Sequence, residues 1–258
     1  MRLMKRILSA AAVLALSASL LVGCSSGTAS SVPVSASSAA ESTVSSVEET
    51  ASSAVDENEA AAAQLLNDLT GSYQELWPVI LADEYKQTWL DDCTALVGEE
   101  NAEAAFEKLS SMVTSDVYGE DAVEAYANGG GAYFCGFTNS LATLTFDGET
   151  STISGTDKDG NVLFSHAYHY IGMEPVRGLY EFESDDADSG EFTYFFLAPD
   201  TSVETYHIEF RYGSDADALS QYDAGDYAYW LASGISTDCD QTMIDNCIEL
   251  FCTENLAG

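Results

Sequence analysis

Three strand-like runs between Gly178 and Gly213 constrain the fold of this chain more than any other feature. The runs are rich in aromatic and β-branched residues, and acidic, Gly or Pro turn residues separate them, which is the pattern of antiparallel hairpins. They cover Glu181–Ser184, Phe192–Leu197 and Thr205–Tyr212. The C-terminal half therefore has to build an antiparallel sheet.

The first 23 residues have the pattern of a secretory signal. Arg2, Lys5 and Arg6 precede an apolar run from Ile7 to Val22. Cations followed by a run of this length form the two opening regions of a signal peptide, and the run is shorter than a membrane-spanning helix needs. We expect export of the chain.

The signal ends in Leu-Val-Gly-Cys, which resembles the bacterial lipoprotein cleavage box, where Cys24 becomes the lipidated first residue. Residues 25 to about 60 are mostly Ser, Ala, Thr, Val and Glu without an aromatic residue, and cannot bury enough surface to offset their chain entropy. We expect a signal peptide over 1–23, a disordered tether over 24–63 and a folded domain over 64–258. The protein is then lipid-anchored at the extracytoplasmic face of the cell membrane. The alternative is an ordinary signal in which Cys24 is incidental.

The chain is strongly acidic. Its formal net charge is −35, and removal of the three cations of the signal gives −35 − 3 = −38. The remaining cations are Lys86, Lys108, Lys158, Arg177 and Arg211. Binding to nucleic-acid phosphates needs basic patches, so this composition excludes a nucleic-acid partner.

Five cysteines follow Cys24, and none lies in a CxxC pair or at a Cys/His zinc spacing. They are Cys93, Cys135, Cys239, Cys247 and Cys252. Export permits disulfides, and an odd number leaves at least one thiol unpaired. We expect most of them to be buried apolar residues, with at most one or two bridges.

The folded domain divides into a helical part and a strand part. From Leu65 to about Asn128 apolar residues follow three-four spacing, which predicts helices. From Tyr133 onward alternation predicts at least six strands joined by short turns such as Asp147-Gly148 and Asp159-Gly160. Strands in this meander order favour an up-and-down barrel.

Two helices are predicted after the strands begin. A short one lies near Asp215–Tyr222, and a final one covers Asp238–Phe251 with Thr237 as its cap. The chain is thus expected to be mainly β, with helices before and after the barrel.

Several short segments match one family in the same order along the chain. They are GSYQELWPVI at Gly71–Ile80, HYIGMEPVRGLYEFES at His169–Ser184, the Leu197-Ala198-Pro199 turn before Tyr206-His207-Ile208, and Asp215–Ile235. In wording and spacing they resemble the ZinT (YodA-type) bacterial zinc-binding proteins, over roughly residues 65–258. The resemblance implies a lipocalin-like (calycin) up-and-down antiparallel barrel with N-terminal helices and a C-terminal helix, and it implies that Gly71–Ile80 is an opening helix.

The resemblance also implies three histidine ligands for zinc. In this chain the three positions hold Phe195, Thr205 and His207. Zinc sites use at least three ligands from Cys, His and carboxylate groups, whereas Phe cannot coordinate a metal and a neutral Thr hydroxyl is a poor substitute. The family's ligand set is therefore not inherited here.

Other groups could complete a metal site around His207. Period-two geometry places Thr205, His207 and Glu209 on one face of their strand. His166 and His169 are three apart on an earlier strand and point to opposite faces, so no more than one faces a barrel interior. A remodelled site would use His207, Glu209 and one of these two histidines. The alternatives are a hydrogen-bonded His207 without metal at the barrel mouth, or weak adventitious binding.

The acidic segment Asp185–Gly190 favours a hairpin turn over a calcium loop. It lacks the calcium-loop spacing, and its twelfth position holds the apolar Phe196.

The sequence contains no catalytic motif of the common enzyme classes, so we expect a non-enzyme. By resemblance, the expected function is zinc binding at the cell surface, with delivery to the solute-binding subunit of a zinc ABC importer. The alternative is a barrel that has lost the metal and binds a small ligand or a protein partner, with Tyr227, Tyr229 and Trp230 as contact residues.

Overall fold

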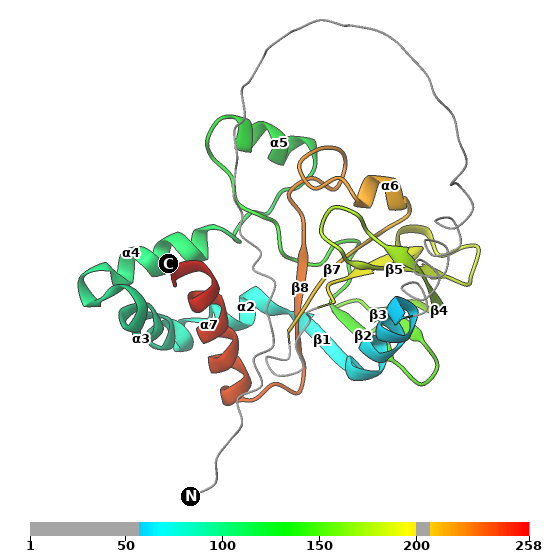
Figure 1. The fold of residues 1–258 in the computed structure, drawn as a ribbon, viewed down its shortest axis with the longest axis horizontal. Helices are drawn as coiled ribbons and strands as arrows, with labels where there is room; N and C mark the ends of the chain where they lie inside the picture. Colours follow the sequence, from blue (N-terminus) through cyan, green and yellow to red (C-terminus); the bar gives the residue numbers. More distant parts are fainter. Residues whose placement is uncertain (1–56, 200–206, 258) are drawn as a thin grey trace, which may run out of the picture. The chain divides into compact units, whose positions relative to one another are not determined.

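Eight strands form a closed barrel in which each strand pairs antiparallel with its neighbours in sequence (Figure 1). This computed structural model describes residues 57–199 and 207–257. The strands are β1 Gly71–Glu75, β2 Thr143–Asp147, β3 Thr152–Thr156, β4 Val162–Met173, β5 Tyr180–Ser184, β6 Tyr194–Leu197, β7 His207–Gly213 and β8 Ala232–Ser236. Tyr73 of β1 lies opposite Leu144 of β2 and Ser236 of β8, so the first and last strands close the barrel. The predicted up-and-down barrel is confirmed.

Most helices precede the second strand, one short helix lies between β7 and β8, and one helix follows the last strand. They are a helix over residues 57–68, α2 Leu76–Ile80, α3 Lys86–Val97, α4 Glu99–Ser111, α5 Glu120–Ala127, α6 Ala216–Leu219 and α7 Gln241–Leu256. Helices α3, α4 and α7 pack against one another beside the barrel (Figure 1). None of the described helices is both long and apolar enough to cross a bilayer.

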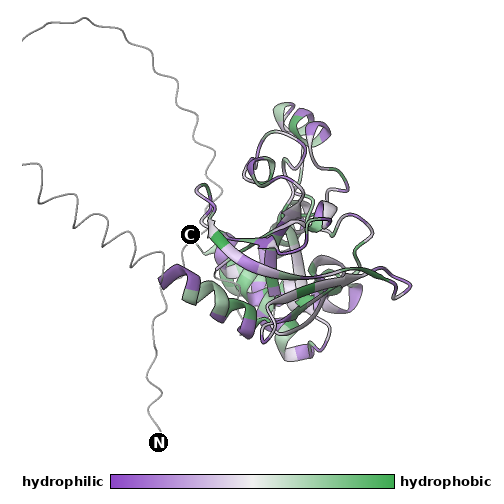
Figure 2. Cartoon of the chain, turned by 90° about the vertical axis from the view of Figure 1, so that its right-hand side faces the viewer, coloured by the Kyte–Doolittle hydropathy of each residue, from purple (hydrophilic) through white to green (hydrophobic). Residues whose placement is uncertain are grey.

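The apolar side chains form two cores. One fills the barrel and includes Phe146, Phe182 and Phe210, with the helix over 57–68 packed against it. The other joins α2, α3, α4 and α7 to Ile235 on β8. In Figure 2 hydrophilic and hydrophobic colours alternate along the elements, as expected when one face of each is buried. The barrel thus has its own core and a helical layer packed against part of its outer face.

The segment Gly71–Ile80 is not one helix, contrary to the expectation. Its first half is strand β1 and only Leu76–Ile80 is helical. The helix-like spacing of the apolar residues arises because two elements follow each other directly. Tyr73 enters the barrel core, where its ring lies 5.7 Å from that of Phe146. Leu76 and Ile80 enter the helical core.

The last helix begins later than predicted. Its N-cap is Asp240, whose Oδ1 accepts a hydrogen bond of 3.0 Å from the Met243 amide. The Thr237 amide instead donates to the Ser72 carbonyl oxygen at 2.8 Å, so Thr237 extends the contact between β8 and β1. Both Thr and Asp are favourable N-cap residues, and here Asp240 is the cap. Thr237 is not available for this role because its backbone pairs with Ser72 of β1.

The folded part also begins earlier than residue 64. The helix over residues 57–68 overlaps the end of the predicted tether, and Ala62 within it is fully buried. The alanines at 60–63 favour a helix, and Leu65, Leu66 and Leu69 continue its apolar face into the barrel core. The predicted signal, Cys24, most of the tether and Thr205 lie outside the described residues.

Candidate functional site

Phe195 lies inside the barrel, at the position of the first family ligand. It is fully buried on β6, between Phe182 of β5 and Tyr212 of β7. Its ring centroid is 5.3 Å from that of Tyr212, 5.4 Å from Tyr168 and 5.8 Å from Phe164. Aromatic rings therefore fill the barrel here, and none of them is a metal ligand.

His207 and Glu209 lie on the opposite face of the sheet from Phe195. On β7 they alternate with Ile208 and Phe210, which belong to the barrel core. Residues paired across two strands share a face, and His207 pairs with Ile235, which belongs to the helical core. Both side chains are half-buried on the outer side of the barrel. His207 therefore cannot share an interior site with the position of Phe195.

His166 and His169 lie on opposite faces of β4. His166 lies on the inner face beside Phe164 and Tyr168, with 19% of its side chain exposed. His169 lies on the outer face, with 53% exposed. The inner position of His166 and the outer position of His207 keep these two histidines on different sides of the sheet.

Both histidines pair with the acidic turn that follows β5. His166 Nδ1 lies 2.7 Å from Asp186 Oδ2, and His169 Nδ1 lies 2.7 Å from Asp185 Oδ1. Sequence reasoning missed these pairs. The register of the β4–β5 hairpin could have revealed them. Ser184 lies opposite Tyr168, so the next two residues, Asp185 and Asp186, continue alongside the part of β4 that holds the histidines.

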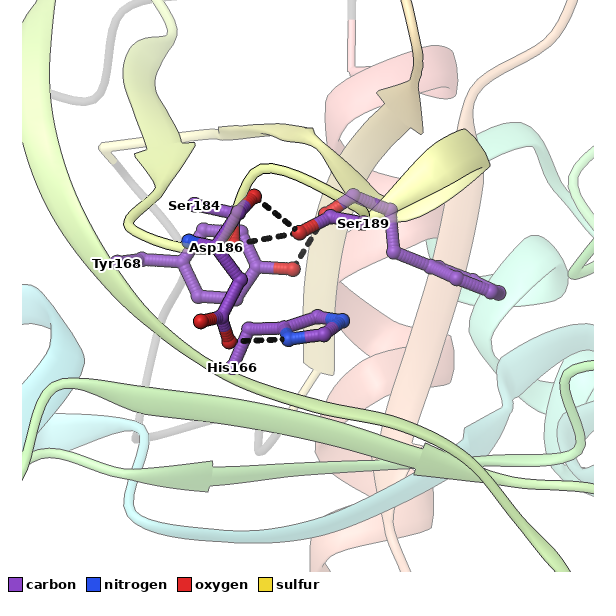
Figure 3. A network of polar contacts seen from close by, with 6 residues as sticks. His166, Tyr168, Ser184, Asp186 and Ser189 are labelled. Atoms are coloured by element: carbon purple, nitrogen blue, oxygen red, sulfur yellow. Dashed lines mark hydrogen bonds and ion pairs between the residues drawn. The ribbon is translucent and has the colours of Figure 1, made fainter.

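Further hydrogen bonds hold this turn in place (Figure 3). Ser189 Oγ lies 2.7 Å from Ser184 Oγ and 2.9 Å from the Asp186 carbonyl oxygen. The Tyr168 hydroxyl donates to the Phe192 carbonyl oxygen, and burial raises the pKa of Tyr168. Hydrogen bonds thus hold the turn in one conformation against β4.

A second polar cluster surrounds Tyr222. The Glu174 carboxylate is buried and accepts hydrogen bonds from the amides of Val176 at 2.6 Å and Arg177 at 2.7 Å, and from the Tyr222 hydroxyl at 3.3 Å. The guanidinium carbons of Arg177 and Arg211 lie 4.2 and 4.4 Å from the centre of the Tyr222 ring. The Glu-Pro-Val-Arg motif therefore has a structural role here.

Arg211 is the buried cation of that cluster. Its side chain is fully buried on the outer face of β7 and donates to the carbonyl oxygens of Leu219, Gln221 and Tyr227. Burial lowers the pKa of the guanidinium from its usual value. These hydrogen bonds from Arg211 hold the segment after α6 against the barrel.

Tyr229, in the segment after α6, forms a group with two other tyrosines. The rings of Tyr126 and Tyr229 stack with centroids 3.6 Å apart, and Tyr133 meets their edges at 6.1 and 5.7 Å. All three are half-buried, and Tyr229 has a positive φ of 56°. A residue other than glycine rarely adopts this conformation unless its surroundings impose it.

The three predicted contact residues have different environments. Tyr229 belongs to the tyrosine group, and Tyr227 is half-buried with its hydroxyl 3.1 Å from Glu191 Oε2. Trp230 is fully buried and its Nε1 donates to the Gly136 carbonyl oxygen at 2.9 Å. Trp230 therefore does not lie at a contact surface, because its side chain belongs to the barrel core and its polar atom is hydrogen-bonded internally.

The described residues do not fit a zinc ion. Across 57–199 and 207–257, no three His, Cys, Asp or Glu side chains come close enough together to hold a metal. The residues of the hypothetical remodelled site are divided between the outer face of β7 and the two faces of β4.

Comparisons with protein-family models and with curated proteins give no match. Among solved structures, the chain is similar to the Zn(II)-bound ZinT-like domain of Streptococcus pneumoniae AdcA, with 14% identity, a TM-score of 0.45, and coverage of 71% of this chain and 89% of that domain. This is the family that the sequence motifs resemble. The chain is also similar to Zn(II)-bound AdcA from the same organism, with 13% identity and a TM-score of 0.43, covering 72% of this chain and 35% of that protein.

Proposed function

We propose that this chain is a membrane-anchored, non-enzymatic binding protein of the extracytoplasmic face, in which a ZinT-like barrel is a scaffold and its interior does not hold zinc. The sequence supports the anchor through the cleavage box at Cys24. The structure supports the role of the barrel as a scaffold, because polar groups such as His166, Glu174 and Ser189 are hydrogen-bonded within the chain.

Phe195 is the observation on which this proposal depends. It replaces the first ligand of the resembled family with a buried ring, and the rings packed against it belong to Phe164, Tyr168 and Tyr212, none of which is a His, Cys or carboxylate residue. His207 faces the other side of the sheet, so restoring one residue would not restore the family's site.

Zinc titration of the exported full chain tests the proposal. We expect weak binding at several sites, because 43 acidic residues attract cations diffusely. The His207→Ala variant should bind as the parent does, and His169→Ala, which removes an exposed histidine, is the matched control. One tight site that disappears in His207→Ala would contradict the proposal, whether His169→Ala keeps that site or also loses it.

The second candidate is zinc binding followed by delivery to the solute-binding subunit of a zinc ABC importer. The sequence resemblance favours it, and His207 with Glu209 two residues later on the same face of β7 would be the ligands from the described part of the chain. The same titration distinguishes the candidates, since delivery requires a stoichiometric site.

The tyrosine group of Tyr126, Tyr133 and Tyr229 is the surface through which we propose that a small ligand or protein partner binds. Stacked, half-exposed tyrosines combine apolar area with hydroxyl groups at little entropic cost. A photoreactive amino acid in place of Tyr229 should crosslink a partner on intact cells, whereas the same amino acid at exposed Asp159 should not. Equal crosslinking from both positions would exclude this surface.

The anchor has its own test. Cys24→Ala should move the protein from the membrane fraction to the medium or periplasm, and unchanged fractionation would show that Cys24 is incidental.

A further inference from the structure

Helices α3 and α7 each place one cysteine at the interface between them. Cys93 and Cys252 are both fully buried, and their sulfur atoms lie 3.9 Å apart. The neighbouring residues pack closely, because the Trp89 ring, one turn before Cys93, meets the Phe251 ring at 5.9 Å. The cysteine pair therefore lies in a closely packed part of the interface between α3 and α7.

The two sulfur atoms are in contact but are not bonded. A disulfide has its sulfurs about 2.0 Å apart, so the gap to close is about 2 Å, which rotation of the two side chains and a small helix shift can provide. Cys247 also lies on α7, but five residues earlier, so its side chain points roughly 140° away around the helix axis. Cys252 is thus the cysteine of α7 that faces α3.

We propose that Cys93 and Cys252 form an intramolecular disulfide that ties α3 to α7 when the chain folds in an oxidising compartment. The proposal uses only the packing of α3 against α7. It rests on the proposed export only because export supplies the oxidant. The two cysteines are 159 positions apart, so the bond would close a loop that contains strands β2 to β8. Cross-links over long loops constrain the unfolded chain most.

The bond forms by two thiol–disulfide exchanges. One cysteine thiolate attacks a sulfur of a disulfide oxidant and releases one reduced thiol, and the second cysteine thiolate then attacks the mixed disulfide and releases the other. In sum the two cysteines lose two protons and two electrons, and the oxidant gains them as two thiols.

The timing follows from burial. Burial raises the pKa of both thiols, and only the thiolate reacts. The folded pair is also closed to solvent, so the exchange has to occur while α3 and α7 are still assembling. Once made, the bond is protected from reductants by the same burial.

Refolding with glutathione tests the pairing without depending on export. The full chain is made in a reducing cytoplasm, unfolded in urea, and refolded in a mixture of oxidised and reduced glutathione. Free thiols are then alkylated under denaturing conditions, and the digested protein is analysed by mass spectrometry. We expect one linked peptide pair that joins Cys93 to Cys252, while Cys135 and Cys239 are alkylated. Alkylation of both Cys93 and Cys252, or a link between other cysteines, would overturn the proposal.

Thermal unfolding provides the second measurement. The parent refolded in reductant after reduction in urea should have a Tm roughly 5–15 °C below that of the parent refolded with glutathione. Cys93→Ala and Cys252→Ala should have equal Tm values that do not respond to reductant, and the double variant should match them. Cys239→Ala, which removes a half-buried cysteine, should keep the reductant response. A response that persists in Cys93→Ala would contradict the assigned pair.

Discussion

Arg211 shows why a single residue in a very acidic chain can be indispensable to its fold. Its guanidinium is fully buried, and it reaches the carbonyl oxygens of Leu219, Gln221 and Tyr227 while lying over the Tyr222 ring. A planar group with five donors can bind several carbonyls at once, which an ammonium on a flexible stem cannot do. The position therefore requires arginine.

Replacing Arg211 with lysine should lower the free energy of unfolding by about 2–4 kcal/mol, because buried carbonyls lose their donors. Urea unfolding measures the change. Arg177→Lys is the matched control, since Arg177 lies over the same ring but is half-buried and bonds the Tyr133 hydroxyl at 3.2 Å. The control should cost less than about 1 kcal/mol. Equal losses would mean that the carbonyl contacts of Arg211 contribute little.

Glu181 makes the stability of the folded protein depend on pH, and the sign of this dependence is opposite to that of an acid in a salt bridge. Burial, with smaller contributions from Glu174 and Asp217, raises the pKa of Glu181 in the folded protein. The folded state thus binds the proton more tightly than the unfolded state, so stability is greatest below the unfolded pKa and falls as the pH rises through the folded value. Glu181→Gln should therefore raise the Tm at pH 7 by up to about 4 °C, with no gain at pH 3. A gain that is equal at both pH values would contradict this origin.

At the scale of elements, strand parity decides what the barrel can bind. Phe195 on β6 faces the interior with Phe210 and Tyr212, whereas His207 on β7 faces the helical side. The sequence predicted that His207 and Glu209 share a face, but it could not show which face, because both faces of β7 pack against other parts of the chain.

Phe195→His should destabilise the protein without creating a zinc site. An imidazole among aromatic rings lacks a hydrogen-bond partner and leaves a cavity, which should cost about 2–4 kcal/mol in urea unfolding. Phe195→Leu, which keeps the site apolar, should cost about 1–2 kcal/mol. Zinc titration should give the same isotherm for both variants. Tight binding by Phe195→His that also requires His207 would show that the two faces are closer than the strand register implies.

Much of the barrel could be predicted from the sequence, because short turns join its strands from β2 to β6 and alternation marks most of them. Strand β1 could not be predicted, since Tyr73 and Leu76 match a helical spacing while entering different cores. The Asp185 and Asp186 partners of the histidines depend on hairpin register, and the Arg211 cluster depends on contacts between distant segments. Such contacts leave no periodic signal in the sequence.

At the scale of the whole molecule, the net charge of −35 dominates the electrostatics. In the part of the chain that the structure describes, only the Lys86–Glu103 ion pair involves a lysine or arginine side chain, and it is exposed with 3.5 Å between Nζ and Oε1. Mutual repulsion of carboxylates therefore opposes compaction.

Salt should stabilise this protein. Raising NaCl from 20 to 500 mM shortens the screening length several-fold, so the Tm should rise by roughly 3–8 °C. Differential scanning calorimetry measures the shift. KCl should give the same curve as NaCl if screening is the cause, and a large difference between the two salts would point to a specific cation site instead.

The contact between β1 and β8 sets a condition on how this protein can be made. Strand β1 acquires its second neighbour only after six intervening strands have formed, and α7, which completes the helical layer, comes later still. A nascent chain that crosses a membrane from its N-terminus therefore emerges with β1 lacking one partner until nearly the whole sequence has been delivered. Under the proposed export, folding of the barrel would follow secretion. A chain truncated before Ala232 would present two open sheet edges prone to pairing with other molecules.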